Sequence, residues 1–129
     1  ADENILDFEE RYLIPAIDAS IDEIRAETLH RGGLIIPAHI DRPTNSLLSQ
    51  LGFLPDLQFS ALEITAWPPA TDPRGHTLIC DSDAHFLDDV GRRTFTFSAE
   101  IGPGAGQDEV FAALAEALRE GSTTLSIAG

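Results

Sequence analysis

Hydrophobic residues occur along this chain in short runs, separated by polar stretches that are rich in proline and glycine. The runs at residues 34–36, 61–64 and 77–80 are largely apolar and too short for buried helices, which predicts strands covered on both faces. Residues 94–97 alternate between polar and apolar positions, which predicts a fourth strand, and residues 123–127 predict a last one.

Capping signals predict where helices lie between these runs. Ser20 and Glu23 form a capping box, so we expect a helix over about residues 20–31. Residues 45–53 predict a short capped helix, and residues 107–119 predict a longer one with two acidic residues in its first turn.

Strands alternating with helices predict an α/β fold with about four to five mostly parallel strands. A complete β/α barrel takes about 250 residues, so this chain corresponds to about half of one. We expect a single domain or fragment over residues 1–129, with residues 1–19 as an irregular lead-in. The open edges of such a sheet favour either a homo-oligomer or completion by the rest of a longer protein, of which this chain is a piece.

Composition and charge exclude several classes of protein. The net charge is −14, from 8 basic and 22 acidic residues, which argues against direct binding of nucleic acid. Every basic residue is arginine, and the absence of lysine excludes phosphate loops and Schiff-base chemistry. No apolar run is long enough to cross a membrane, and the N-terminus does not have the pattern of an export signal. The single cysteine, Cys80, agrees with a cytoplasmic location and lies in an apolar run where we expect an inert thiol.

The most informative polar cluster directly follows the third predicted strand. Asp83 and His85 form a D-x-H pair that offers a carboxylate and an imidazole to a common metal ion. Asp81 is expected to be a further ligand or a hydrogen-bond acceptor that orients an imidazole. The alternative is that Asp83 caps a turn and His85 is a packed surface residue, but the position after a buried strand favours the metal site.

A second cluster follows the first predicted strand and contains His39. Arg42 follows it, and Arg92 and Arg93 follow the D-x-H cluster, where guanidinium groups suit a phosphate beside a metal. The alternative is that these arginines are counter-charges to neighbouring aspartates. Of the other histidines, His30 and His76 are expected to have structural roles in a helix end and a turn.

The motifs that carry these residues resemble the C-terminal half of the PHP-domain (polymerase and histidinol phosphatase) metal-dependent phosphoesterases. They are G-G-L-I-I-P-A-H-I-D-R-P, S-L-L-S-Q-L-G-F, A-L-E-I and S-D-A-H-F-L-D-D-V-G-R-R. The resemblance implies part of a distorted (β/α)7 TIM-like barrel that holds up to three divalent metal ions, Zn, Mn or Fe. It assigns His39, Asp83 and His85 as metal ligands. The family's earlier ligands, including an H-x-H motif, have no match in this chain.

The resulting hypothesis is a metal-dependent hydrolase of phosphorylated small molecules or nucleotides, in which this chain alone is catalytically incomplete. One alternative is a non-catalytic remnant, or an oligomerisation or regulatory module, with vestigial metal ligands. Another is an unrelated metal-binding module that uses only these three ligands.

Overall fold

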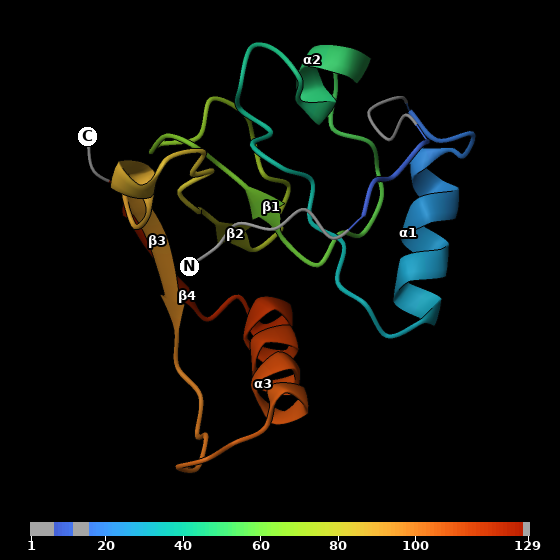
Figure 1. Ribbon diagram of the computed structural model, residues 1–129. Helices are drawn as coiled ribbons and strands as arrows, with labels where there is room; N and C mark the ends of the chain where they lie inside the picture. The colour runs from blue at the N-terminus through green and yellow to red at the C-terminus, as the bar shows by residue number, and fades with distance from the viewer. Residues whose placement is uncertain (1–6, 12–15, 128–129) are drawn as a thin grey trace.

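The computed structural model describes residues 7–11 and 16–127 of the chain (Figure 1). This part folds into three α-helices, one short 3-10 helix and two separate two-stranded sheets. In chain order the elements are α1 (Ile21–His30), α2 (Leu47–Leu51), β1 (Leu62–Glu63), β2 (Leu78–Ile79), η1 (Leu87–Asp89), β3 (Arg93–Phe97), α3 (Gln107–Glu120) and β4 (Thr123–Ile127).

The three predicted helices are confirmed, with ends close to those expected. The Ser20 side chain accepts a hydrogen bond from the Glu23 backbone N–H at 3.2 Å, and the Glu23 carboxylate accepts one from the Ser20 N–H at 2.7 Å. Helix α1 therefore begins at the predicted capping box. Helix α2 begins at a cap made by Ser46 and ends at Gly52, which has a φ of 77°.

Strands β1 and β2 pair in parallel, with Leu62 opposite Leu78 and Glu63 opposite Ile79. On the other side of β1, residues 35–40 run alongside it without forming a regular strand. Their backbone accepts hydrogen bonds from Ser60 and Glu63, through the carbonyls of Ile35 at 2.9 Å and Pro37 at 3.1 Å. These three neighbouring segments all run in the same direction, so the loops that follow them meet at one edge.

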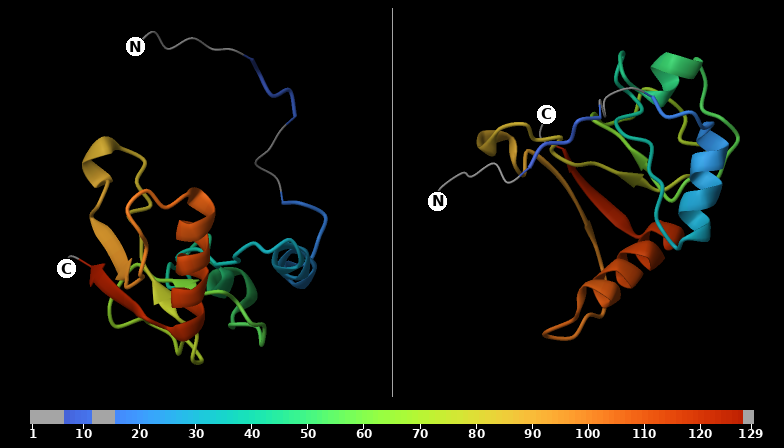
Figure 2. Two further views of the ribbon diagram at one scale, coloured as in Figure 1. Left: turned by 90° about the horizontal axis from the view of Figure 1, so that it is seen from below. Right: turned by 45° about the vertical axis from the view of Figure 1, so that its right-hand side comes forward.

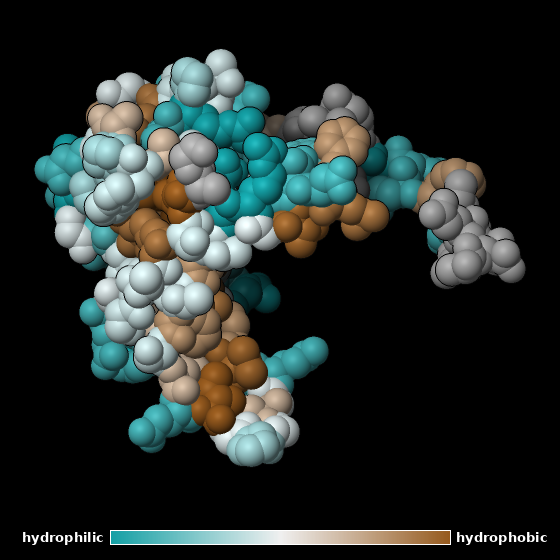
Figure 3. Space-filling view, turned by 90° about the vertical axis from the view of Figure 1, so that its left-hand side faces the viewer, coloured by the Kyte–Doolittle hydropathy of each residue, from teal (hydrophilic) through white to brown (hydrophobic). Residues whose placement is uncertain are grey.

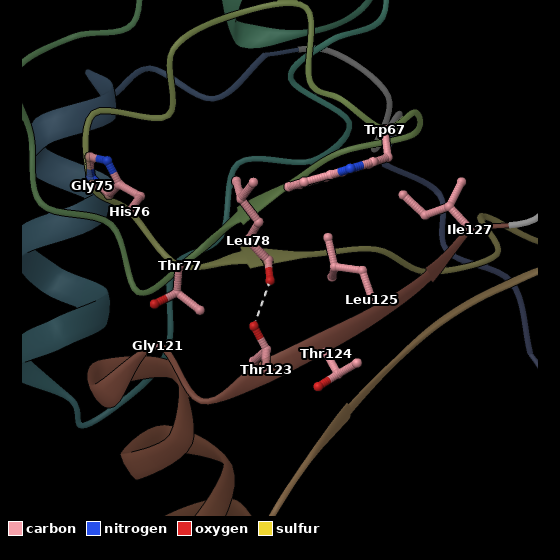
Figure 4. A pocket seen from close by; sticks show the side chains of 10 residues that line it. All are labelled: Trp67, Gly75, His76, Thr77, Leu78, Gly121, Thr123, Thr124, Leu125 and Ile127. Carbon is pink, nitrogen blue, oxygen red and sulfur yellow. Dashed lines mark hydrogen bonds between the residues drawn. The ribbon is translucent and has the colours of Figure 1, made fainter.

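Strands β3 and β4 form an antiparallel pair that lies beside β2. The Thr123 hydroxyl donates a hydrogen bond to the Leu78 carbonyl at 2.9 Å (Figure 4), and the Cys80 thiol donates one to the Thr94 carbonyl at 2.9 Å. Side chains therefore join the two sheets where a continuous backbone ladder was expected. Cys80 is fully buried, and burial raises the pKa of its thiol, which agrees with the predicted inert role.

The predicted partial (β/α)7 barrel with four to five mostly parallel strands is wrong. The described residues contain one parallel pair and one antiparallel pair, and the predicted strand at residues 34–36 has no regular strand structure. The chain reverses direction in the loop after β3 (Figures 1 and 2). Helix α3 and strand β4 therefore both run in the direction opposite to that of β3. A helix that itself made the return crossing would have placed β4 parallel to β3.

The buried core is small and lies in two clusters around β1 and β2. One contains Ile40, Leu62 and Ile64, and the other joins Ala61 and Ile79 to Leu118 of α3. Apolar side chains also reach the surface, and Figure 3 shows hydrophobic patches on the side that carries β3, β4 and α3. No helix among the described residues is both long and apolar enough to cross a bilayer.

The predicted irregular lead-in falls partly outside the described residues. Within it, residues 7–11 and 16–19 contain neither helix nor strand, which agrees with the prediction for those positions.

Candidate functional site

A polar cavity of about 340 Å³ lies where the loops after β1 and β2 meet. Five of the predicted site residues line it, and they come from two segments about 40 positions apart in the sequence. The lining consists of Arg42, Thr65, Ser82, Asp83, His85, Asp89, Arg92 and Arg93. The structure therefore brings Arg42 of the first polar cluster to the same cavity as four residues that follow the third predicted strand.

Asp41 holds the two loops of this edge together. Its carboxylate accepts hydrogen bonds from the backbone N–H groups of Thr65 and Ala66, each at 2.9 Å, and from the Thr65 hydroxyl at 2.9 Å. These bonds join the loop after β1 to the segment that carries His39 and Arg42. Asp41 is therefore committed to structure and is not available as a counter-charge to Arg42.

Asp83 forms an ion pair with Arg42, whose Nη1 lies 2.8 Å from Oδ2. The two side chains are 33% and 44% exposed, so solvent weakens the attraction between them. The Asp81 carboxylate accepts the Asp83 backbone N–H at 2.8 Å, and Asp83 has a φ of 46°. Asp81 thus supports a left-handed backbone conformation at Asp83, where the sequence had suggested support for an imidazole.

The His85 ring is oriented by its own loop. Its Nδ1 lies 2.9 Å from the carbonyl oxygen of Asp83. A carbonyl oxygen only accepts hydrogen bonds, so this contact assigns the hydrogen to Nδ1 and leaves the lone pair of the neutral ring on Nε2. That arrangement is the usual one for an imidazole that binds a metal through Nε2.

The arginines of the cavity differ in how their charges are balanced. Arg92 forms an ion pair with Asp89 at 2.7 Å, as the counter-charge interpretation predicts. Arg93 donates instead to two backbone carbonyls, from Nε to Asp81 at 2.8 Å and from Nη2 to Ser82 at 3.3 Å. No carboxylate in residues 7–11 and 16–127 lies within ion-pair distance of it. Its charge therefore remains available to an anion in the cavity.

His39 lies beside β1. Its backbone N–H donates to Glu63 Oε2 at 3.0 Å, and its φ of 33° places it in the left-handed region. Its Nδ1 is buried and has no hydrogen-bond partner among residues 7–11 and 16–127. Buried polar atoms usually have partners, so this atom points to a group that protein side chains do not supply.

Glu63 is the functional candidate that the sequence interpretation missed. It is 5% exposed, and its Oε1 is a second buried atom without a hydrogen-bond partner in the described part of the chain. Burial raises the pKa of this carboxyl, the hydrogen bond from His39 opposes the shift, and the carboxylates of Asp81 and Asp83 add to it. A single acidic residue inside the apolar run A-L-E-I was the available signal.

The predicted ligands are not assembled into a closed metal site. No three histidine, cysteine or acidic side chains in the described part of the chain gather closely enough to hold an ion. Asp83 is turned toward Arg42, and His39 is not among the residues that line the cavity. The unpartnered atoms of His39 and Glu63 nevertheless fit a cation, because Glu63 Oε1 offers lone pairs and His39 Nδ1 offers one when the ring carries its hydrogen on Nε2.

A larger cavity of about 590 Å³ lies between Trp67 and β4 (Figure 4), and it contains none of this chemistry. It has no carboxylate or arginine in its lining. The hydroxyls of Thr77 and Thr123 already donate to backbone carbonyls. The ring of His76 contacts the carbonyls of Pro73 and Leu57 at 2.8 and 3.1 Å, which agrees with its predicted structural role.

Comparison with known proteins identified no relative: no family model, no curated protein and no solved structure matches this chain. The resemblance to PHP domains therefore remains a prediction from the motifs.

Proposed function

We propose that the 340 Å³ cavity binds a phosphate ester beside a divalent metal ion and forms part of a metal-dependent phosphoesterase site. The observation that supports this proposal most directly is the convergence of Arg42, Asp83, His85, Arg92 and Arg93 on one cavity. Carboxylate and imidazole ligands next to guanidinium groups suit a phosphoryl group and its metal.

Arg93 is the principal phosphate-binding residue in this proposal. Its two backbone contacts fix the guanidinium at the cavity wall, and no carboxylate of the described residues neutralises it. Arg42 and Arg92 are already paired with Asp83 and Asp89. An anion therefore gains most from Arg93, because binding there breaks no existing ion pair.

His39, Asp83 and His85 would hold the metal ion in this proposal. A bound ion of this kind activates water and neutralises phosphoryl oxygens. Asp83 contacts Arg42 through Oδ2, so a metal ion bound at that oxygen would displace Arg42 and free its guanidinium for the substrate. Asp83 would thus have a positive partner in both states, Arg42 before the metal ion binds and the metal ion afterwards. Arg42 would pair first with Asp83 and then with the substrate phosphate.

The metal part of the proposal is tested by equilibrium dialysis of the chain against Zn²⁺ or Mn²⁺, followed by elemental analysis. We expect the Asp83→Asn/His85→Ala variant to bind less metal than the wild-type chain. The variant Asp88→Asn is a matched control, because Asp88 lies five positions away and does not line the cavity. Equal metal content in the wild-type chain and the double variant would contradict the proposal.

A second candidate function is phosphate-ester binding without metal or catalysis, as in a non-catalytic remnant or regulatory module. It is favoured by the Arg42–Asp83 ion pair and by the lack of an assembled ligand set in the described residues. In that case inorganic phosphate binds equally well with and without added Mn²⁺, and chelation has no effect. We also propose a phosphorylated small molecule or nucleotide as the ligand, a cytoplasmic location, and self-association through exposed apolar side chains such as Phe86 and Leu87.

A further inference from the structure

Two neighbouring side chains each bury a polar atom that has no hydrogen-bond partner among the described residues. These atoms are His39 Nδ1 and Glu63 Oε1, and the two residues are joined by the hydrogen bond from the His39 N–H to Glu63 Oε2. Two such atoms on residues that are hydrogen-bonded to each other are unusual, because a buried group without a partner loses its hydration and gains no hydrogen bond in return.

A direct hydrogen bond between the two free atoms would have been the simplest way to satisfy them. The structure contains no such bond, although the residues are linked through the backbone of one and the side chain of the other. Glu63 Oε1 supplies lone pairs, and His39 Nδ1 supplies one in the tautomer that carries its hydrogen on Nε2. An imidazole nitrogen with a carboxylate oxygen is a common pair of ligands for a divalent cation.

The surroundings favour a positive charge at this position. Glu63 is 5% exposed, so its carboxylate is largely removed from water. Arg42 neutralises Asp83, whereas no cation of the described residues forms an ion pair with Glu63. A divalent ion next to Glu63 would offset the cost of this buried carboxylate.

The backbone at His39 indicates that the pair is held in place. A φ of 33° is uncommon for a residue with a side chain and persists only where the surroundings impose it. Here the Glu63 carboxylate accepts the His39 N–H, and the next residue, Ile40, donates its N–H to the Glu63 carbonyl at 2.9 Å. Glu63 thus fixes the backbone that carries the imidazole through one contact to His39 and one to Ile40.

We infer that Glu63 is a metal ligand of this protein, and that its Oε1 and His39 Nδ1 bind one divalent cation together. The inference rests on the proposed metal-dependent function and adds to it a ligand that lies on β1, outside the D-x-H motif. It also assigns the nitrogen that His39 uses, which is Nδ1, whereas the loop contact of His85 leaves Nε2 for that residue.

The test is isothermal titration of Zn²⁺ into the full chain, comparing wild type with Glu63→Gln. Glutamine keeps the shape of the side chain and an oxygen that accepts the His39 N–H, but it removes the charge. We expect the affinity for Zn²⁺ to fall at least about tenfold. The control is Glu100→Gln, which removes the same charge at an exposed position and should leave the affinity unchanged.

A second measurement uses only the wild-type chain, so it does not depend on the folding of a variant. Zn²⁺ is added to protein labelled with ¹⁵N in histidine, and the two ring nitrogens of His39 are assigned by NMR. The inference predicts that the Nδ1 resonance shifts to the position of a metal-bound nitrogen while Nε2 does not.

The outcomes separate this inference from the proposed function. If Glu63→Gln binds Zn²⁺ as tightly as wild type, or if His39 binds through Nε2, the inference is wrong and the cavity proposal stands. If the wild-type chain binds no Zn²⁺, both are wrong.

Discussion

Replacing Glu63 with glutamine should stabilise the metal-free protein, although the same change weakens metal binding. The side chain is 5% exposed, its Oε1 has no partner, and its pKa is raised by burial. A buried polar group without a partner costs about 1–3 kcal/mol, and the cost is larger when the group is charged. Glutamine keeps the acceptor for the His39 N–H and leaves an uncharged NH2 group in place of Oε1, so only the extra cost of the charge is removed. We therefore expect a gain of about 1 kcal/mol at neutral pH.

The pH dependence of this effect has a definite sign. Because the folded-state pKa of Glu63 is above its unfolded value of 4.5, the folded protein holds this proton more tightly than the unfolded chain does. The contribution of Glu63 to stability is therefore greatest below the unfolded pKa and declines as the pH rises through the folded one. The advantage of Glu63→Gln should be smallest in acid and should grow across that range.

The assay is urea unfolding followed by circular dichroism, from about pH 4 to pH 8, with a chelator present throughout. Wild type, Glu63→Gln and the exposed control Glu100→Gln are compared at each pH. If Glu63→Gln is less stable than wild type at neutral pH, the carboxylate stabilises the fold through contacts that the structure does not contain. The same result would also remove the argument that Glu63 costs the protein stability and is present because it binds a metal ion.

Three further predictions concern a cap, the core and the ion pair. Ser20→Ala should lower the stability of the protein by about 0.5–2 kcal/mol in thermal unfolding, because α1 loses its capping box. If stability does not fall, α1 contributes nothing to cooperative unfolding. Leu118→Ala should cost about 2–5 kcal/mol in urea unfolding, since Leu118 is 2% exposed, whereas Leu87→Ala, at a residue 90% exposed, should cost little. Arg42→Gln should increase the affinity for Mn²⁺ in calorimetry by releasing Asp83, and a decrease would show that the ion pair does not compete with metal.

The elements that the sequence predicted well are those with local signals. Helix α1 begins at a capping box within four residues, and α3 shows its pattern over four turns, so neither depends on distant parts of the chain. The strands depend on partners elsewhere in the sequence. The apolar run at residues 34–36 found hydrogen bonds to β1 without regular pairing, and β4 paired with β3 in the direction opposite to that expected.

The residues of the candidate site likewise divide into those that a local sequence pattern predicted and those whose roles depend on distant parts of the chain. Asp83 and His85 were recognised because two potential ligands one residue apart follow an apolar run. Glu63 and Asp41 were missed because their roles depend on contacts with residues 24 and 25 positions away, which no local pattern encodes. Likewise, only the structure distinguishes Arg93, which is free of carboxylates among the described residues, from its neighbour Arg92, which pairs with Asp89.

The central claim is that one cavity holds a metal ion and a phosphate together. The most direct test is the broadening of the ³¹P resonance of phenyl phosphate by Mn²⁺ bound to the chain, with Arg93→Gln as the comparison. We expect the wild-type chain to broaden the resonance beyond the effect of free Mn²⁺. Arg93→Gln should lose this extra broadening while it binds the same amount of Mn²⁺. No broadening by wild type beyond that of free Mn²⁺ would contradict a shared site, and equal extra broadening by Arg93→Gln would contradict the role of Arg93 in binding the phosphate.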